Sequence, residues 1–155
     1  MRYLRNAVAA MVAVVVMAGG ARAAEPTSPV RPFHGDIDKL TKQSSDFRRV
    51  LFTGAHTQVV AMSLAAGEDI GDEVHTVDQC FFVVAGKGQS VVSGQTSALA
   101  ADEALCVPAG VRHNIRNTGS DPLKLYTIYS PPQHPAGTVH HTKQEAQRAE
   151  AHLSR

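Results

Sequence analysis

Short apolar runs recur along the chain between residues 58 and 130, and Gly, Pro or Asp separates one run from the next. Several runs alternate apolar with polar residues, most clearly Leu-Lys-Leu-Tyr-Thr-Ile-Tyr at 123–129. Strands are therefore predicted at 58–64, 80–84, 90–92, 96–99, 104–107, 111–117 and 123–129. Ser93-Gly94-Gln95 lies between two of them and is a hairpin signal. Short strands about ten residues apart predict an all-β sandwich or barrel.

The segments that flank this region have a different pattern. Residues 36–49 are polar, with Ile37 and Leu40 at helical spacing, which predicts a short helix or an irregular cover. Thr142 is followed three residues later by Glu145, a capping-box pattern, and good helix formers come next. A C-terminal helix is therefore expected from about Lys143.

The first 23 residues follow the three-part plan of a secretory signal peptide. Arg2 and Arg5 precede an uncharged run from Ala7 to Ala18, and Ala21-Arg22-Ala23 forms a small-x-small cleavage site. The run of about 12 residues is too short to span a bilayer core of about 30 Å as a helix. We expect cleavage after Ala23 and export to the periplasm or the medium, with an uncleaved membrane anchor as the alternative.

The composition agrees with one turn-rich β domain, since the 155 residues include twelve Gly, eight Pro and no Trp. The expected division is a signal peptide at 1–23, a leader and N-terminal cover segment at 24–57, a barrel at 58–130, and a C-terminal loop and helix at 131–155. Loss of the signal peptide would change the formal net charge from +1 to about −2. The sequence has no clustered basic face, so we expect a small-molecule ligand and no nucleic acid. We expect no membrane association after cleavage, and a homodimer is compatible with these features.

Four polar residues form the main candidate for chemistry. Glu73, His75 and Gln79 are two and four residues apart, so an extended strand would direct all three side chains to one face. A turn within 76–78 would change that arrangement. His113 follows soon after Pro108-Ala109-Gly110.

These residues resemble the first sequence motif of the cupin superfamily, G-x5-H-x-H-x3,4-E-x6-G. Every spacing fits, and the matching positions are Gly67, Glu73, His75, Gln79 and Gly86. Two residue types depart from the pattern, because Glu73 stands at the usual first His and Gln79 at the usual Glu.

The second cupin motif, G-x5-P-x-G-x2-H-x3-N, is also matched in order and spacing. Its positions are held by Asp102, Pro108, Gly110, His113 and Asn117, with Asp102 in place of the first Gly. The chain is most similar to small single-domain cupins that are called mannose-6-phosphate-isomerase-like. The resemblance implies a cupin jelly-roll barrel with an N-terminal extension and a short C-terminal helix.

The resemblance also implies one divalent metal ion, held by Glu73, His75, Gln79 and His113. Two imidazoles and one carboxylate suit Mn, Fe, Co, Ni or Zn. A degraded, metal-free pocket is the alternative. Residues considered as further contacts to a substrate or to the ligands are Arg112, Tyr126, Tyr129, His134, His140 and His141. Core packing for the tyrosines and plain surface exposure for the histidines are the other interpretations.

Cupins pair the strand after Gln79 with the strand before Pro108, which implies that Cys80 and Cys106 lie side by side. An exported protein meets oxidising conditions, so a disulfide is one expectation, and two packed free thiols are the other.

Two functions follow from the resemblance. One is a metal-dependent enzyme, isomerase-like or oxygenase-like, that acts on a small oxygen-rich molecule. The other is a binding module that captures a sugar or a carboxylate without turnover. A fold cannot decide between them.

Overall fold

The computed structural model describes residues 31–153, so the predicted signal peptide at 1–23 and the start of the leader lie outside the described residues. The elements are α1 (Ile37–Gln43), β1 (Arg48–Thr53), β2 (Gln58–Leu64), β3 (Asp78–Ala85), β4 (Lys87–Val92), β5 (Gln95–Ala100), β6 (Ala104–Val107), β7 (His113–Arg116), β8 (Leu123–Ser130), β9 (Val139–His140) and α2 (Lys143–Leu153). Within residues 31–153, no helix is both long and apolar enough to cross a membrane.

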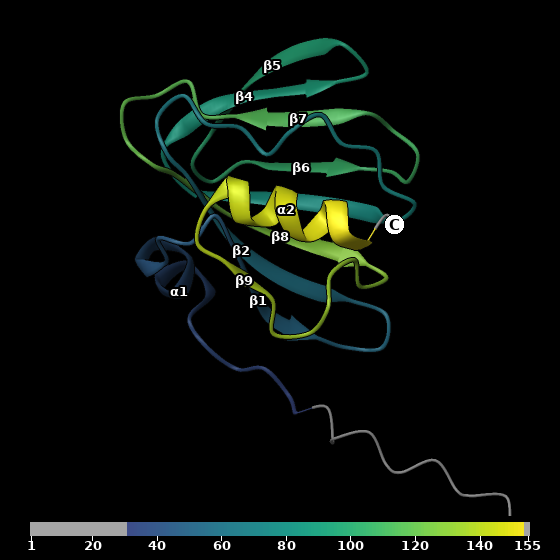
Figure 1. The fold of residues 1–155 in the computed structure, drawn as a ribbon. Coiled ribbons are helices and arrows are strands. Elements are labelled where there is room, and N and C mark those ends of the chain that lie inside the picture. The colour runs from purple at the N-terminus through teal and green to yellow at the C-terminus, as the bar shows by residue number, and fades with distance from the viewer. Residues whose placement is uncertain (1–30, 154–155) are drawn as a thin grey trace, which may run out of the picture.

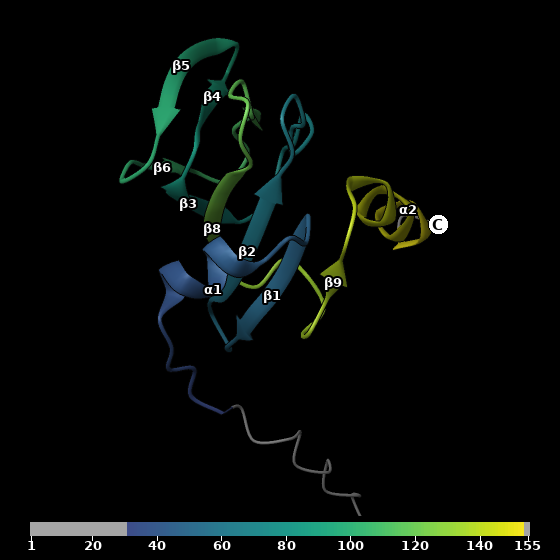
Figure 2. The same ribbon diagram turned by 90° about the vertical axis from the view of Figure 1, so that its left-hand side faces the viewer.

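The strands form a jelly roll of two antiparallel sheets. One sheet has the order β6-β3-β8-β2-β1-β9 and the other the order β5-β4-β7, as Figures 1 and 2 show. Strand β8 is central, and its alternation places Leu123, Leu125, Thr127 and Tyr129 in the interior. The predicted all-β class is confirmed, and each of the seven predicted strands corresponds to one of β2 to β8.

The hairpin signal at 93–95 is also confirmed. Ser93 and Gly94 connect β4 to β5, and both have positive φ, 49° and 81°. Two central residues with positive φ give the turn a twist that matches the flanking strands. The motif glycines Gly86 and Gly110 lie in the same left-handed region, with φ of 86° and 81°.

The six-stranded sheet extends beyond the expected 58–130 range at both ends. Strand β1 pairs with β2 and lies inside the segment expected to be leader and cover, and β9 pairs with β1. The sequence pattern did not predict β1, because it begins with Arg48 and Arg49, which look like surface residues. Arg48 is in fact buried, with 2% of its surface exposed.

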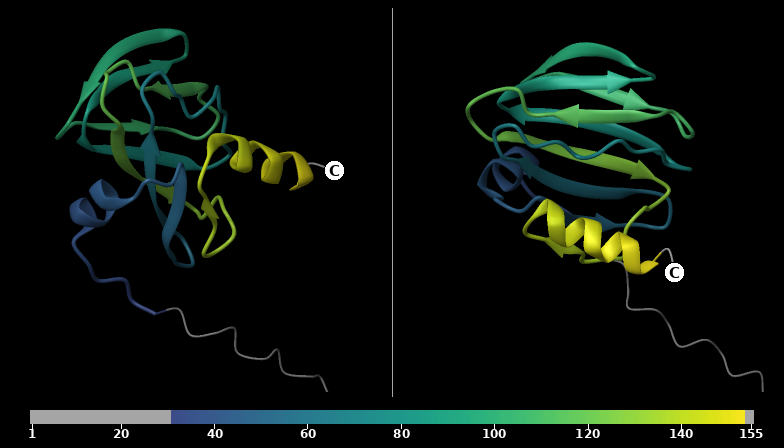
Figure 3. Two further views of the ribbon diagram at one scale, coloured as in Figure 1. Left: turned by 60° about the vertical axis from the view of Figure 1, so that its left-hand side comes forward. Right: turned by 45° about the horizontal axis from the view of Figure 1, so that its top comes forward.

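Both predicted helices are present. Asp36 caps α1, its carboxylate accepting a hydrogen bond from the Lys39 backbone N–H at 2.9 Å. Helix α2 begins at Lys143 as predicted, and the Thr142 hydroxyl accepts from the Glu145 backbone N–H at 3.2 Å. The Glu145 carboxylate reaches back to the His141 backbone N–H, one residue before the position that the usual capping box would use. Figure 3 shows α2 packed beside the sheet, at the yellow end of the chain.

Strands β3 and β6 pair so that Cys80 lies directly opposite Cys106. Their Cα atoms are 4.0 Å apart and their sulfurs form a disulfide, so both cysteines of the chain are bonded. The neighbouring pair, Gln79 and Val107, is buried. The two sides of these strands therefore carry different chemistry, a disulfide outward and an amide inward.

Candidate metal centre

The loop between β2 and β3 brings Glu73 and His75 to β7. Glu73 and His113 form a two-residue bridge, in which each backbone N–H donates to the other's carbonyl oxygen at 2.9 and 3.0 Å. The His75 carbonyl accepts from the Gly110 backbone N–H at 2.7 Å. Both residues that the motif spacing singled out in this loop are therefore held against the segment that carries His113.

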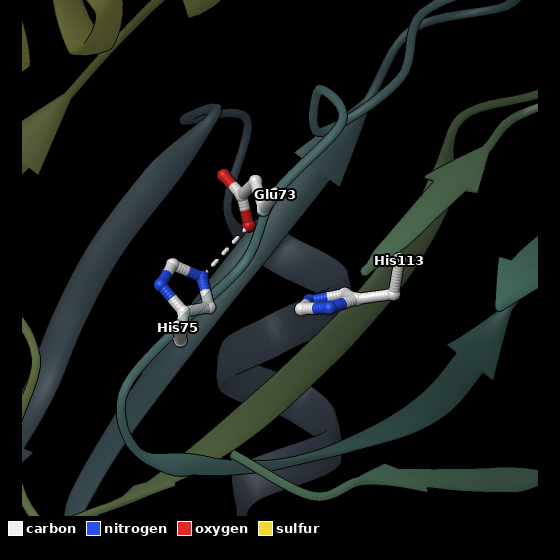
Figure 4. A group of neighbouring side chains, drawn as sticks. All are labelled: Glu73, His75 and His113. Atoms are coloured by element: carbon white, nitrogen blue, oxygen red, sulfur yellow. Dashed lines mark hydrogen bonds and ion pairs between the residues drawn. The ribbon is translucent and has the colours of Figure 1, made fainter. Parts of the chain in front are cut away.

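The side chains of Glu73, His75 and His113 converge. Their ligand atoms all lie within 4.8 Å of one another, and Figure 4 shows the His113 ring directed from its strand toward the other two. His75 Nε2 is 3.0 Å from Glu73 Oε2, and the two imidazole ring centroids are 5.6 Å apart. The structure thus contains a His/Glu cluster of a kind that could bind a metal ion.

Gln79 joins this cluster from β3. Its side-chain oxygen is 3.0 Å from His113 Nε2, and only 1% of its surface is exposed. The chain bends at Thr76 and Val77, so Glu73 and Gln79 do not lie on one continuous strand. Of the two arrangements left open by the sequence, the turn within 76–78 is therefore the one present, and the single-strand geometry does not hold. The side chains still meet, because β3 begins after the bend with Gln79 directed inward.

The hydrogen bonds of His113 give a direct test of whether these residues suit a cation. His113 Nδ1 lies 2.9 Å from the Val111 carbonyl oxygen, which can only accept, so the neutral ring carries its proton on Nδ1. The lone pair of Nε2 then faces the Gln79 oxygen, another acceptor. A lone pair on Nε2 is what a metal ligand needs, and metal-ligating imidazoles usually donate their other N–H in this way.

A residue that sequence reasoning missed lies next to this cluster. Arg48 on β1 places Nη2 3.8 Å from Glu73 Oε1, and its Nη1 is 2.6 Å from Glu150 Oε1 on α2. Only 3% of the Arg48 side chain is exposed. No local signal could have identified it, because its position depends on the pairing of β1 with β2 and on the placement of α2.

Tyr129 and His134 pack around the cluster. The Tyr129 ring meets both the His75 and the His134 rings edge to face, with centroids 5.6 and 5.1 Å apart. Burial raises the pKa of Tyr129 well above its usual range, so the phenol stays protonated. Burial, with a contribution from Arg48, lowers the pKa of His134 to about 3, so this imidazole is neutral at physiological pH.

The remaining sequence candidates differ in the residues that they contact. His140 on β9 is the strand partner of Arg48, and burial lowers the pKa of its imidazole. Tyr126 belongs to the other face of β8, where it stacks on Phe82 with centroids 4.9 Å apart. Arg112 is exposed and pairs with Asp72 at 2.7 Å. His141, also exposed, binds Asp46 at 2.6 Å.

A pocket of about 320 Å³ opens beside Glu73 and His75. Its walls are formed by Glu73, Val74, His75, Gln133, His134, Pro135 and Glu150. A larger cavity of about 630 Å³ lies along β4, β5 and β6 and contains none of the four predicted ligands. The smaller pocket is therefore the one connected to the cluster, because it contains Glu73 and His75 and the larger cavity does not.

Comparison with known proteins finds one matching family model and several similar proteins. The family model described as "Cupin domain" matches residues 60–129. The chain is 48% identical over 127 residues to the uncharacterized protein YrkC of Bacillus subtilis, covering 77% of this chain and 68% of that protein. It is 38% identical over 110 residues to the uncharacterized protein L612 of Acanthamoeba polyphaga mimivirus, covering 67% of this chain and 68% of that protein.

Solved structures agree with these sequence relatives. The crystal structure of BH2720 from Bacillus halodurans has a TM-score of 0.76 and 46% identity, covering 78% of this chain and 97% of that one. KdgF from a Halomonas species has a TM-score of 0.51 and 21% identity, covering 56% of this chain and 78% of that one. The latter likeness extends to the fold alone.

Proposed function

Because this chain belongs to the cupin superfamily, we propose that it binds one divalent metal ion through Glu73, His75, Gln79 and His113 and acts on a small oxygen-rich molecule. The observation that carries this proposal is the convergence of Glu73, His75 and His113, whose ligand atoms all lie within 4.8 Å of one another. Gln79 adds a side-chain oxygen 3.0 Å from His113 Nε2.

The donor set selects the kind of ion. Two imidazoles, one carboxylate and one amide oxygen suit Mn, Fe, Co, Ni or Zn. They suit Ca and Mg less well, because those ions prefer ligand sets made only of oxygen atoms. Gln79 contributes no formal charge, so Glu73 is the one carboxylate in the set. When bound, a divalent ion with an open position would polarise a carbonyl group or activate water or dioxygen.

The residues of the chain would orient a ligand and shield it from water. The buried ring of Tyr129 packs edge to face against His75 and His134, two residues that line the pocket. The segment that follows β8 contributes His134 and Pro135 to the lining. Arg48 pairs with Glu150, so helix α2 is tied to the same site. A small pocket with a few converging polar groups is the usual form of a small-molecule site.

A binding module remains the second candidate function, and one observation favours it. An effective general base has a pKa near the working pH. The pKa of His134 is lowered to about 3, so its neutral imidazole is a weak base and better suited to hydrogen bonding. Glu150 is the remaining acidic group of the pocket outside the ligand set, and it is paired with Arg48 at 2.6 Å.

Elemental analysis of the purified protein tests the proposal. One equivalent of a transition metal is expected in the wild type, with strong loss in His113→Ala and retention in His56→Ala, a control at an exposed histidine between β1 and β2. Full occupancy in His113→Ala would overturn the ligand assignment. A turnover screen of bound compounds, with and without dioxygen, then separates an enzyme from a binding module.

We also propose that the protein is exported. The support is the signal-peptide pattern together with the Cys80–Cys106 disulfide, because disulfides persist mainly in oxidising compartments. Mass spectrometry of protein from its host should find an N-terminus at Ala24. A mature protein that retains Met1 would contradict cleavage.

A further inference from the structure

We infer that helix α2 and a metal ion at the candidate centre stabilise each other on the barrel. Glu150 of α2 lines the same pocket as Glu73 and His75, so the docked helix completes the pocket wall. The Glu150 carboxylate would be attracted by an ion on these ligands, which keeps α2 in place, and the docked helix would raise the affinity for the ion in return. This inference rests on the proposed function and deepens it, because it makes the pocket depend on the bound ion.

One face of α2 makes its contacts with the rest of the protein. Lys143, Ala146 and Glu150 are three and four residues apart, so they share one side of the helix. Lys143 Nζ pairs with Asp69 Oδ1. Glu150 Oε1 accepts from Arg48 Nη1 at 2.6 Å. Among the α2 residues whose side chains the structure describes, Ala146 alone is buried. Because an alanine buries little apolar surface, the two ion pairs are a substantial part of what holds the helix.

Both ion pairs connect α2 to the loop that carries two of the candidate ligands. Asp69 and Glu73 lie on this loop, between β2 and β3, and each forms a backbone bridge to β7. Asp69 contacts α2 directly through Lys143. Glu73 is connected to the helix through Arg48, whose Nη2 lies 3.8 Å from Glu73 Oε1. The helix is therefore fastened at two points to the loop that would hold the ion.

The charges at this junction set the sign of the effect. Without an ion, the single guanidinium of Arg48 lies between two carboxylates, 2.6 Å from Glu150 and 3.8 Å from Glu73. A divalent ion adds two positive charges to the pocket that Glu150 lines, so the carboxylate of the helix is attracted more strongly. Glu150 also competes with Glu73 for Arg48, which leaves Glu73 freer to bind the ion. Linkage then requires that the docked helix and the ion favour each other by the same factor.

Hydrogen exchange of the purified protein, with and without saturating Mn²⁺, tests the inference. We expect the backbone amides of α2 to exchange about tenfold more slowly with Mn²⁺, a factor typical of coupling between two sites. Helix α1 is the internal reference, because a general stabilisation of the fold would slow both helices alike. Equal slowing of α1 and α2, or unchanged α2 exchange in a protein that binds Mn²⁺, would overturn the inference. Failure of the wild type to bind Mn²⁺ would instead overturn the proposed function, and with it the inference.

A Glu150→Gln variant removes the charge and keeps a side-chain oxygen for Arg48. We expect its Mn²⁺ affinity to be about tenfold lower than that of the wild type, and most of the Mn²⁺-dependent slowing in α2 to be lost. Asp121→Asn is the matched control, since Asp121 is exposed and lies in the loop between β7 and β8, and it should leave both unchanged. Wild-type Mn²⁺ affinity in Glu150→Gln would contradict the inference.

A Lys143→Met variant separates docking of the helix from a simple effect of charge. Loss of this positive charge would by itself raise the affinity for a cation, whereas loss of the pair with Asp69 should loosen α2 and lower it. We expect faster exchange of the α2 amides together with lower Mn²⁺ affinity. Faster α2 exchange with unchanged or higher affinity would contradict the linkage, and unchanged exchange would contradict the part of Lys143 in docking.

Discussion

Arg48 Nη2 lies 3.8 Å from Glu73 Oε1, so a buried cation is placed directly beside a predicted metal ligand. This neighbour competes with a metal ion for the carboxylate of Glu73. The same guanidinium binds Glu150 on α2 at 2.6 Å. The Arg48 guanidinium therefore links the candidate metal centre to the C-terminal helix.

Replacing Arg48 by Met should raise affinity for Mn²⁺ by roughly tenfold. At an effective dielectric constant near 20, a unit charge about 8 Å from a divalent ion repels it by about 4 kcal/mol, and water and salt in the open pocket reduce this further. The folded fraction must be measured alongside, because loss of a buried ion-pair partner destabilises the protein. Arg49→Met is the matched control, since the Arg49 side chain is 43% exposed and pairs with Asp46 instead. Weaker Mn²⁺ binding by folded Arg48→Met would contradict the charge argument.

A Gln79→Glu substitution should increase metal affinity and destabilise the metal-free protein. The new carboxylate would be almost fully buried within reach of Glu73, so without an ion its charge is poorly compensated. With an ion it supplies a second anionic ligand. Thermal unfolding with and without Mn²⁺ should therefore show a larger metal-induced rise in Tm than in the wild type. An equal rise in both proteins would argue against Gln79 as a ligand.

The disulfide should contribute substantially to stability. Cys80 and Cys106 are 26 residues apart, and closing a loop of this length stabilises by about 3 kcal/mol on the chain-entropy model. The double variant Cys80→Ala, Cys106→Ala should lose about that amount in urea unfolding. Reductant should lower the stability of the wild type and leave the double variant unchanged. A wild type insensitive to reductant, despite full reduction of its thiols, would contradict the prediction.

His134 should make the protein less stable as the pH falls below about 6.5. Burial, then Arg48, lowers its folded-state pKa to about 3, so between these pH values the unfolded chain binds a proton that the folded chain does not. The stability is complete above pH 6.5, and roughly 2 kcal/mol is lost by pH 5.

Urea unfolding between pH 5 and pH 7.5 measures this effect. The slope of stability against pH should be smaller in His134→Asn than in the wild type, whereas the exposed control His56→Asn should keep a wild-type slope. Identical slopes in His134→Asn and the wild type would show that His134 titrates normally in the folded protein.

The local sequence pattern predicted strands β2 to β8, but it did not predict β1 and β9. Alternation in β8 and the turn residues at 93–95 are set by neighbouring residues, so the sequence alone indicated them. Strand β1 was not predicted, because Arg48 is buried against two acidic residues far away in the sequence, Glu73 and Glu150. No local pattern can reveal such partners. The same holds for the hydrogen bonds between the Gln58 side-chain amide and the His134 backbone, which join residues 76 positions apart.

The four predicted ligands depended on motif spacing rather than on strand periodicity. Periodicity could not decide between one continuous strand for Glu73 and Gln79 and a turn within 76–78, and the chain bends at Thr76 and Val77. The bend changes the path and preserves the convergence, because Glu73 is fixed by its bridge to His113 and Gln79 by the pairing of β3 with β8. Motif spacing thus identified four residues that lie together, whereas strand periodicity did not give the path of the chain between them.

The pairing of Cys80 with Cys106 also ties the disulfide to one register of β3 and β6. A slip of one residue would place Cys80 opposite Leu105 or Val107 in place of Cys106. The register that the disulfide joins is the one in which Gln79 is buried opposite Val107. The covalent bond therefore locks the strand alignment that keeps the amide of Gln79 inside the barrel, whether or not an ion is bound.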